Sequence, residues 1–178
     1  MSIPNLLSIG RMILVPIFVI TFFGYPDHGL VSALILVLSG ITDCLDGMIA
    51  RKFNMITSLG KILDPLADKL TQLAVCICLA IRHKEFIIIL CLLIAKELIM
   101  LIAGFYLIRR GTKIPSSRWF GKVATVVFYC VMVYIVYDVH VPMGVMGILI
   151  GVVILFAVLA FIQYIPQFKK LLCMQKVK

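Results

Sequence analysis

Four aspartates stand in two pairs between positions 43 and 68 of the sequence. Asp43 and Asp46 are three residues apart, and Asp64 and Asp68 are four residues apart. Either spacing places two side chains on one face of a helix, separated by about one turn. Two such faces, opposed, would gather all four carboxylates. We call Asp43, Asp46, Asp64 and Asp68 the carboxylate cluster.

Carboxylates within an otherwise apolar sequence need a partner, because an isolated ionised group is very costly in a medium of low dielectric constant. All four side chains offer oxygen, and no His or Cys stands in a matching position, so Mg²⁺ or Mn²⁺ suits them better than Zn²⁺. Cys44 lies between the first two aspartates but points away from their shared helix face, which favours a packing role. The alternative is a buried polar network that serves only helix packing.

The stretch resembles the signature D-x2-D-G-x2-A-R-x8-G-x3-D-x3-D of the CDP-alcohol phosphotransferases. The residues that match in type and spacing are Asp43, Asp46, Gly47, Ala50, Arg51, Gly60, Asp64 and Asp68. The resemblance implies that an alcohol attacks the β-phosphorus of a CDP-linked lipid and releases CMP. It implies two metal ions held by Asp43, Asp46 and Asp64, with Asp68 as the general base that also contacts a metal. A homodimer is a further expectation from the family.

The same resemblance implies a binding site for the CDP-lipid. Gly47 and Ala50 occupy the small positions where the family admits the cytidine, and the Arg51 guanidinium can hold a diphosphate in a bidentate fork. Gly60 has no Cβ, so a backbone or a ligand phosphate can approach it closely. Simple packing between helices is the alternative for both glycines.

A second polar group lies close to the amino terminus. Asn5, Ser8 and Arg11 repeat every three residues, which places them on one helix face. One interpretation is a turn whose side chains snorkel to the membrane interface. The other is a polar lining of the nucleotide site, because a similar Pro-Asn and downstream Arg opens many phosphatidylglycerophosphate synthases. On the second interpretation Asn5 joins the predicted residues that bind the CDP-lipid.

The alcohol acceptor is less strongly indicated. Residues 3–5, 63–69 and 121–122 resemble phosphatidylglycerophosphate synthases, which favours glycerol 3-phosphate. Lys96-Glu97 stands where those enzymes usually show Arg-Glu, and the sequence after it also resembles the cardiolipin synthases of this superfamily, which accept phosphatidylglycerol.

A phosphorylated acceptor needs a second anion site. The basic residues available for it are Lys96, Arg109, Arg110, Arg118 and Lys122. Lys96 and Glu97 could instead form only a structural pair, although charged residues within a membrane span are functional candidates by default.

Composition predicts the fold class. The 178 residues are 63% hydrophobic and only 14% charged, far more apolar than a soluble globular domain. We expect an all-α integral membrane protein, a single domain over 1–178, with about six transmembrane helices in one bundle and no cleavable signal peptide. The expected spans end near Phe23, Arg51, Ile81, Ile108, Tyr137 and Tyr164. The six cysteines are predicted to be small buried hydrophobes without disulfides.

Charge predicts the partners and the orientation. The formal net charge is +9, but the basic residues stand at the ends of apolar runs, which favours anionic lipids and phosphate-bearing substrates over nucleic acid. In a six-span arrangement the loop after 51, the region 109–122 and the basic tail fall on one side. The positive-inside rule then places both termini and the carboxylate cluster on the cytoplasmic side of a multi-pass cell membrane protein.

Two hypotheses from other classes remain. A lipid-binding or scaffold protein could retain the fold without catalysis, but the intact set of four aspartates argues against it because buried carboxylates are costly. A small transporter is the other, and the sequence has neither paired inverted repeats nor broken helices to indicate it.

Overall fold

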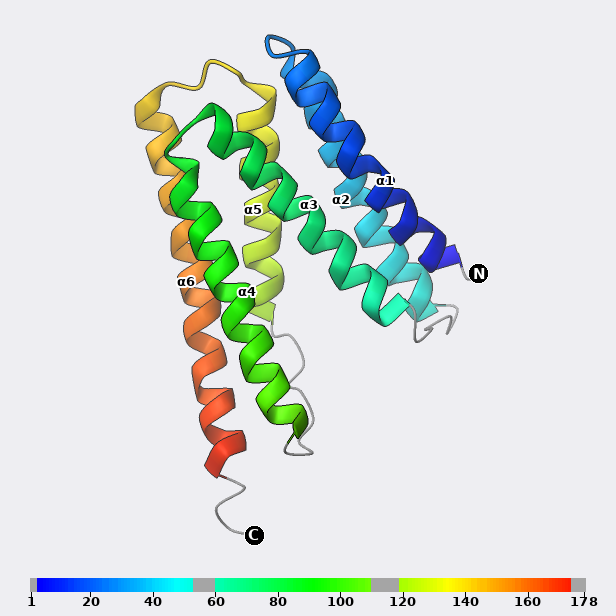
Figure 1. The fold of residues 1–178 in the computed structure, drawn as a ribbon, viewed down its shortest axis with the longest axis vertical. Coiled ribbons are helices and arrows are strands. Elements are labelled where there is room, and N and C mark those ends of the chain that lie inside the picture. The colour runs from blue at the N-terminus through cyan, green and yellow to red at the C-terminus, as the bar shows by residue number, and fades with distance from the viewer. Residues whose placement is uncertain (1–2, 53–59, 110–118, 174–178) are drawn as a thin grey trace.

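A computed structural model describes residues 3–52, 60–109 and 119–173. Within these ranges the chain is entirely helix and short turns, which confirms the predicted all-α class (Figure 1). The helices are α1 (Ile3–Gly24), α2 (Gly29–Lys52), α3 (Gly60–Arg82), α4 (Phe86–Arg109), α5 (Trp119–Tyr137) and α6 (Met143–Cys173).

Successive helices run in alternating directions, so the structure has two distinct ends (Figure 1). The turns at 25–28, 83–85 and 138–142 lie at the upper end. The first turns of α1 and α3, the last turn of α2 and the last turn of α6 lie at the lower end. α1 packs against both α2 and α3, whereas α5 packs against α2 and α6, and α4 packs against α3 and α6.

The distribution of side chains on α1 is inverted relative to a soluble protein. Ile13, Ile17 and Ile20 are exposed, whereas Ser8 and Arg11 are completely buried. An exposed apolar face is stable in lipid, where no hydrophobic penalty applies. The chain is therefore a membrane protein whose polar side chains face inward.

Within the described ranges, three helices contain segments long and apolar enough to cross a membrane. These segments are 5–24 of α1, 29–46 of α2 and 143–162 of α6, and α5 adds a shorter apolar stretch at 123–137. The number of crossings made by α3 and α4 stays a prediction. Pro16 and Pro65 lie inside α1 and α3, as membrane helices tolerate.

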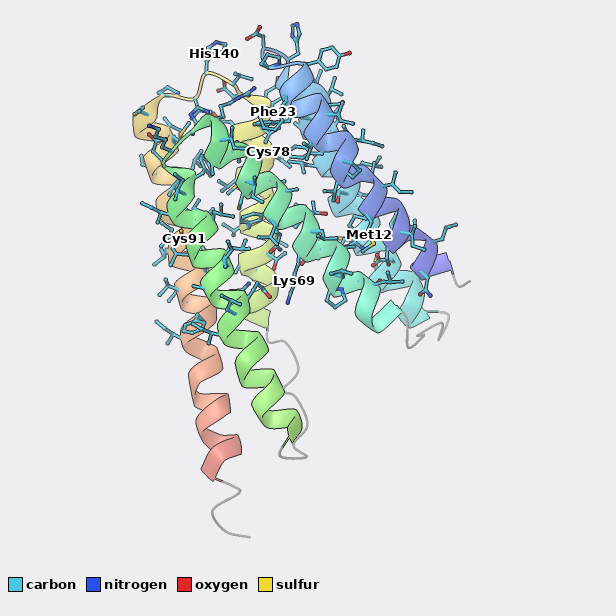
Figure 2. The ribbon with its side chains drawn as sticks, in the orientation of Figure 1. Met12, Phe23, Lys69, Cys78, Cys91 and His140 are labelled. Atoms are coloured by element: carbon cyan, nitrogen blue, oxygen red, sulfur yellow. The ribbon has the colours of Figure 1, made fainter. Side chains whose placement is uncertain are left out.

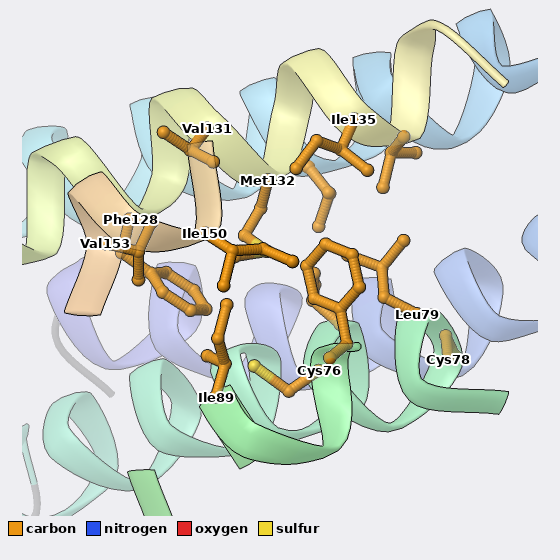
Figure 3. Packing of buried hydrophobic residues seen from close by; sticks show 14 of the residues in the cluster. Cys76, Cys78, Leu79, Ile89, Phe128, Val131, Met132, Ile135, Ile150 and Val153 are labelled. Atoms are coloured by element: carbon orange, nitrogen blue, oxygen red, sulfur yellow. The ribbon is translucent and has the colours of Figure 1, made fainter. Parts of the chain in front are cut away.

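The apolar core fills the upper half of the structure. Figure 3 shows Leu79 of α3, Ile89 of α4, Met132 of α5 and Ile150 of α6 converging there, and all four are buried. Phe18 of α1 belongs to the same core. Because every helix contributes to it, this core fixes the bundle from which the lower half extends.

Two cysteines follow the prediction and three do not. Cys76 and Cys78 are buried in the core, but Cys44, Cys91 and Cys130 are exposed. The thiol is a small apolar group that lipid accommodates as well as a protein core does, so burial was not required. None of these five cysteines forms a disulfide.

α6 is longer than predicted. We expected its span to end near Tyr164, but the helix continues to Cys173. Loss of apolar character ends a membrane span without ending a helix, because the helical hydrogen bonds are made by the backbone.

Gly29 marks a close approach between two helices at the upper end. A Cβ at this position would overlap the carbonyl oxygens of Val136 and Tyr137, so the start of α2 lies directly against the end of α5. Only glycine fits there without moving a helix.

Candidate active site

Three helices bring polar residues to the lower half of the structure. Asp43 and Asp46 lie in the lower half of α2, and Asp64 and Asp68 lie in the first turns of α3. The first turns of α1 lie at the same end (Figure 1). The carboxylate cluster and the polar face of α1 therefore share one region of the molecule.

The Arg11 guanidinium binds the first pair of aspartates. Its Nη1 donates to Asp43 and its Nη2 donates to Asp46. Arg11 is completely buried and Asp46 nearly so, whereas 40% of the Asp43 side chain is exposed. The planar guanidinium can serve two carboxylates at once, which a lysine ammonium cannot match in geometry. A buried arginine without such partners would be strongly destabilising.

Ser8 connects α1 to the second pair of aspartates. Its hydroxyl donates to Asp64, one helical turn before Arg11 reaches the first pair. Two neighbouring side chains of α1 thus contact Asp64 and the first pair, and a common depth of both pairs in the membrane stays a prediction. The two pairs are not simply opposed, however. α1 packs against both α2 and α3 and supplies the donors that carboxylates cannot supply to each other.

The polar face of α1 belongs to the site. Asn5, Ser8 and Arg11 are all buried, so the interpretation as a snorkelling turn is wrong, because snorkelling side chains end in water. Their burial agrees with the alternative interpretation as a polar lining, and the lining of a nucleotide site stays a prediction. Ser8 and Arg11 were named on this face as part of one interpretation, but only Asn5 was carried into the predicted site, and the contacts of Ser8 and Arg11 with the aspartates were not predicted.

Asp68 is held from two directions. The Tyr129 hydroxyl donates to its Oδ1 over 3.1 Å, and the Gln72 amide donates to its Oδ2 over 3.2 Å. Asp43 and Arg11 lie close enough to act on it electrostatically. Sequence reasoning missed Gln72 and Tyr129. Gln72 follows Asp68 by one turn, which was a usable signal, but Tyr129 lies in a distant apolar helix.

A smaller charged group links α3 to α4. Glu97 forms ion pairs with Lys69 and with Lys96, the second over 3.2 Å. Figure 2 labels Lys69 on α3, where it directly follows Asp68. The structural pair foreseen between Lys96 and Glu97 is present. A contribution of Lys96 to phosphate binding stays a prediction, and 43% of its side chain is exposed.

The remaining predicted residues are placed less completely. Gly60 begins α3 and is buried. The last turns of α2 carry Gly47, Ala50 and Arg51. Arg109 is the last residue of α4, and Lys122 lies in the first turn of α5. Arg110 and Arg118 lie outside the described residues.

The residues present fit a divalent cation by their chemistry. The single positive charge of Arg11 stands against four carboxylates, so these side chains together keep a net negative charge, and the candidate ligand atoms of the cluster are all oxygens. Among the described residues, no three His, Cys, Asp or Glu side chains are grouped closely enough to enclose a metal ion. Binding of two ions by this cluster stays a prediction.

Comparison with known proteins identifies the family. The family model of the CDP-alcohol phosphatidyltransferases matches residues 1–162. The chain belongs to this family, as its aspartate signature predicted.

Relatives carry the names of two enzymes. A CDP-diacylglycerol–glycerol-3-phosphate 3-phosphatidyltransferase of Aquifex aeolicus is 37% identical over 127 residues, which is 70% of each chain. One of the same name from Rickettsia bellii is 44% identical over 101 residues, covering 56% of this chain and 55% of that protein. A cardiolipin synthase (CMP-forming) of Streptomyces coelicolor is 38% identical over 129 residues, covering 70% of this chain and 60% of that protein.

Proposed function

We propose that this chain transfers a phosphatidyl group from CDP-diacylglycerol to sn-glycerol 3-phosphate, giving phosphatidylglycerophosphate and CMP in phospholipid biosynthesis. The observation that carries the proposal is the gathering of carboxylates from α2 and α3 around the buried polar face of α1. The family and the names of the relatives support it.

The carboxylate cluster is the proposed centre of the chemistry. Two Mg²⁺ or Mn²⁺ ions bound there would neutralise the diphosphate and stabilise the departing CMP oxygen. Asp43, Asp46 and Asp64 supply ligands, and Asp68 accepts the proton of the acceptor hydroxyl. The freed oxygen forms a bond to the β-phosphorus as the bond from that phosphorus to CMP breaks.

The lower ends of α1, α2 and α3 are the proposed CDP-lipid site. Gly47 and Ala50 leave room for the cytidine, and Arg51 pairs with the diphosphate. Asn5 and Gly60 are buried near the starts of α1 and α3. Because the outer faces of these helices are apolar, the acyl chains can stay in the bilayer while the head group reaches the carboxylates.

The acceptor phosphate is proposed to bind a basic group at the same end. Lys96 extends from α4, and the remaining members are Arg109, Arg110, Arg118 and Lys122. These cations suit a doubly charged phosphate.

The proposed orientation places this end in the cytoplasm. Acidic residues outnumber basic ones in the upper turns, which carry Asp27, Glu85 and Asp138 against Arg82 and Lys84. The lower helix ends and the carboxyl-terminal tail are strongly basic by contrast. A cell membrane then holds the protein, and a homodimer is part of the proposal from the family.

A second candidate is a cardiolipin synthase that uses phosphatidylglycerol as the acceptor. The Streptomyces coelicolor relative of that name favours it, as does the sequence around Lys96.

One assay separates the candidates. Purified protein in detergent receives CDP-diacylglycerol with Mg²⁺ or Mn²⁺, and CMP release is measured with glycerol 3-phosphate and with phosphatidylglycerol in parallel. Release with glycerol 3-phosphate alone is the expected result. Release with phosphatidylglycerol alone would establish the second candidate. Absence of CMP release with both acceptors, in protein that still binds CDP-diacylglycerol, would contradict catalysis and favour the lipid-binding alternative.

A further inference from the structure

Asp68 has an unusual set of neighbours for a carboxylate in an apolar bundle. Each of its two oxygens accepts a hydrogen bond, from Tyr129 on α5 and from Gln72 on its own helix. Donors on both oxygens resist rotation of the carboxylate plane in either direction. Because a carboxylate oxygen has two lone pairs, each oxygen keeps one acceptor site for a further proton or cation.

Tyr129 reaches Asp68 from a different part of the bundle. α5 packs against α2 and α6. Two close neighbours of Tyr129 in the sequence, Phe128 and Val131, belong to the apolar core. The backbone that carries the hydroxyl is therefore anchored in the apolar core. A hydroxyl in such surroundings is costly without a partner, and Asp68 is the partner that it meets.

We propose that Tyr129 is a positioning residue for Asp68, with Gln72 as the second. The proposal rests on the proposed function, in which Asp68 takes the proton of the acceptor hydroxyl. The two donors hold the carboxylate so that its remaining lone pairs face that hydroxyl. Tyr129 does not touch the reacting atoms.

The alternative is a purely structural bond that only satisfies the tyrosine hydroxyl. A structural bond and a positioning bond differ in which measured properties change when the bond is lost. A structural bond stabilises the fold, so its loss lowers the thermal stability and the bound CDP-lipid together with turnover. A positioning bond acts on the chemical step, so its loss lowers kcat while stability and binding stay close to the parent values.

The test compares Tyr129→Phe with Tyr134→Phe, a matched loss of one hydroxyl from an exposed position on the same helix. CMP release gives kcat and the KM for each substrate. Binding of CDP-diacylglycerol and thermal unfolding are measured on the same preparations. We expect Tyr129→Phe to lower kcat by about 10–100-fold, as the loss of an outer partner of a catalytic group typically does. The binding of CDP-diacylglycerol and the unfolding temperature of Tyr129→Phe should equal those of the parent protein. Tyr134→Phe should equal the parent in kcat as well.

Gln72→Leu supplies an independent variant should Tyr129→Phe fail to fold. It should lower kcat in the same way, and the double variant should lose less than the product of the two single losses, because both donors act on one carboxylate. Normal kcat in Tyr129→Phe, or parallel losses of kcat, binding and stability, would overturn the inference alone. Absence of CMP release from the parent protein with either acceptor would overturn the proposed function as well.

Discussion

The largest buried side chains differ in kind between the two halves of the bundle. The lower half encloses Ser8, Arg11 and Asp46, whereas the upper half encloses Phe18 and Leu79. In lipid, apolar side chains gain little by leaving the solvent, so the upper half is held by close packing. The lower half is held by ion pairs and hydrogen bonds that fail when one partner is removed. Substitutions in the two halves should therefore have different effects on stability and turnover.

The largest effect is expected at Asp68. Asp68→Asn should retain binding of CDP-diacylglycerol but lower kcat by about 100- to 10,000-fold, the usual contribution of a general base. Asp27→Asn, in an exposed turn of the upper end, is the matched control and should release CMP at the parent rate. Near-normal turnover in Asp68→Asn would show that another group takes the proton.

The next effect is expected at Arg11. Arg11→Met leaves two carboxylates without their cation and should lower the free energy of unfolding by about 3–5 kcal/mol in the absence of divalent cations. Added Mg²⁺ should recover part of the loss, since it can replace the missing charge.

The control for Arg11 lies in the upper half. The Arg82 guanidinium packs 4.4 Å from the centre of the Phe22 ring, so Arg82→Met loses a contact without leaving a buried opposite charge. Its destabilisation should be about 1 kcal/mol and should not respond to Mg²⁺. Equal losses in equilibrium unfolding of the two variants would remove the proposed distinction between the halves.

A smaller effect is expected in the apolar core. Leu79→Ala leaves a cavity in the core and should lower the free energy of unfolding by about 2–3 kcal/mol, with kcat per folded molecule unchanged. Ile81→Ala removes a similar volume from an exposed position on the same helix and should have little effect. A fall in kcat with normal stability in Leu79→Ala would mean that the upper half takes part in the chemistry.

The smallest effect is expected at Cys44, although it lies inside the aspartate signature. Its side chain is exposed on α2. Cys44→Ala should change stability by less than about 0.5 kcal/mol and leave CMP release intact. A marked loss of activity would show that the thiol contributes to the site.

The sequence was sufficient for the residues that repeat within one helix. The aspartate pairs, the polar face of α1 and the apolar spans all follow from helical periodicity, and the structure places them as that periodicity requires. The sequence did not predict which side chains of different helices contact each other. Nothing in the spacing of Tyr129 distinguishes it from Tyr134 and Tyr137 in the same helix, and only the packing of α5 brings its hydroxyl to Asp68.

The errors have a common cause in the membrane environment. Hydropathy located the end of the apolar part of α6 but not the end of its helix at Cys173. The three exposed cysteines were assigned to the interior because they are apolar, yet in lipid an apolar residue is equally stable on either side. Conversely, Arg11 was open to assignment at the interface, and only its partners on α2 fix it inside.

Gly29 gives the upper end an influence on activity that its composition does not suggest. Helices are stiff, and at Gly29 the start of α2 lies directly against the end of α5. Asp43 lies roughly 21 Å further along α2, and Tyr129 about 12 Å back along α5, at 1.5 Å per residue. A side chain at position 29 would separate the two helices and so disturb the spacing between the carboxylates and the tyrosine that holds one of them. A genetic screen for lost activity should therefore recover substitutions of this glycine together with those of the aspartates.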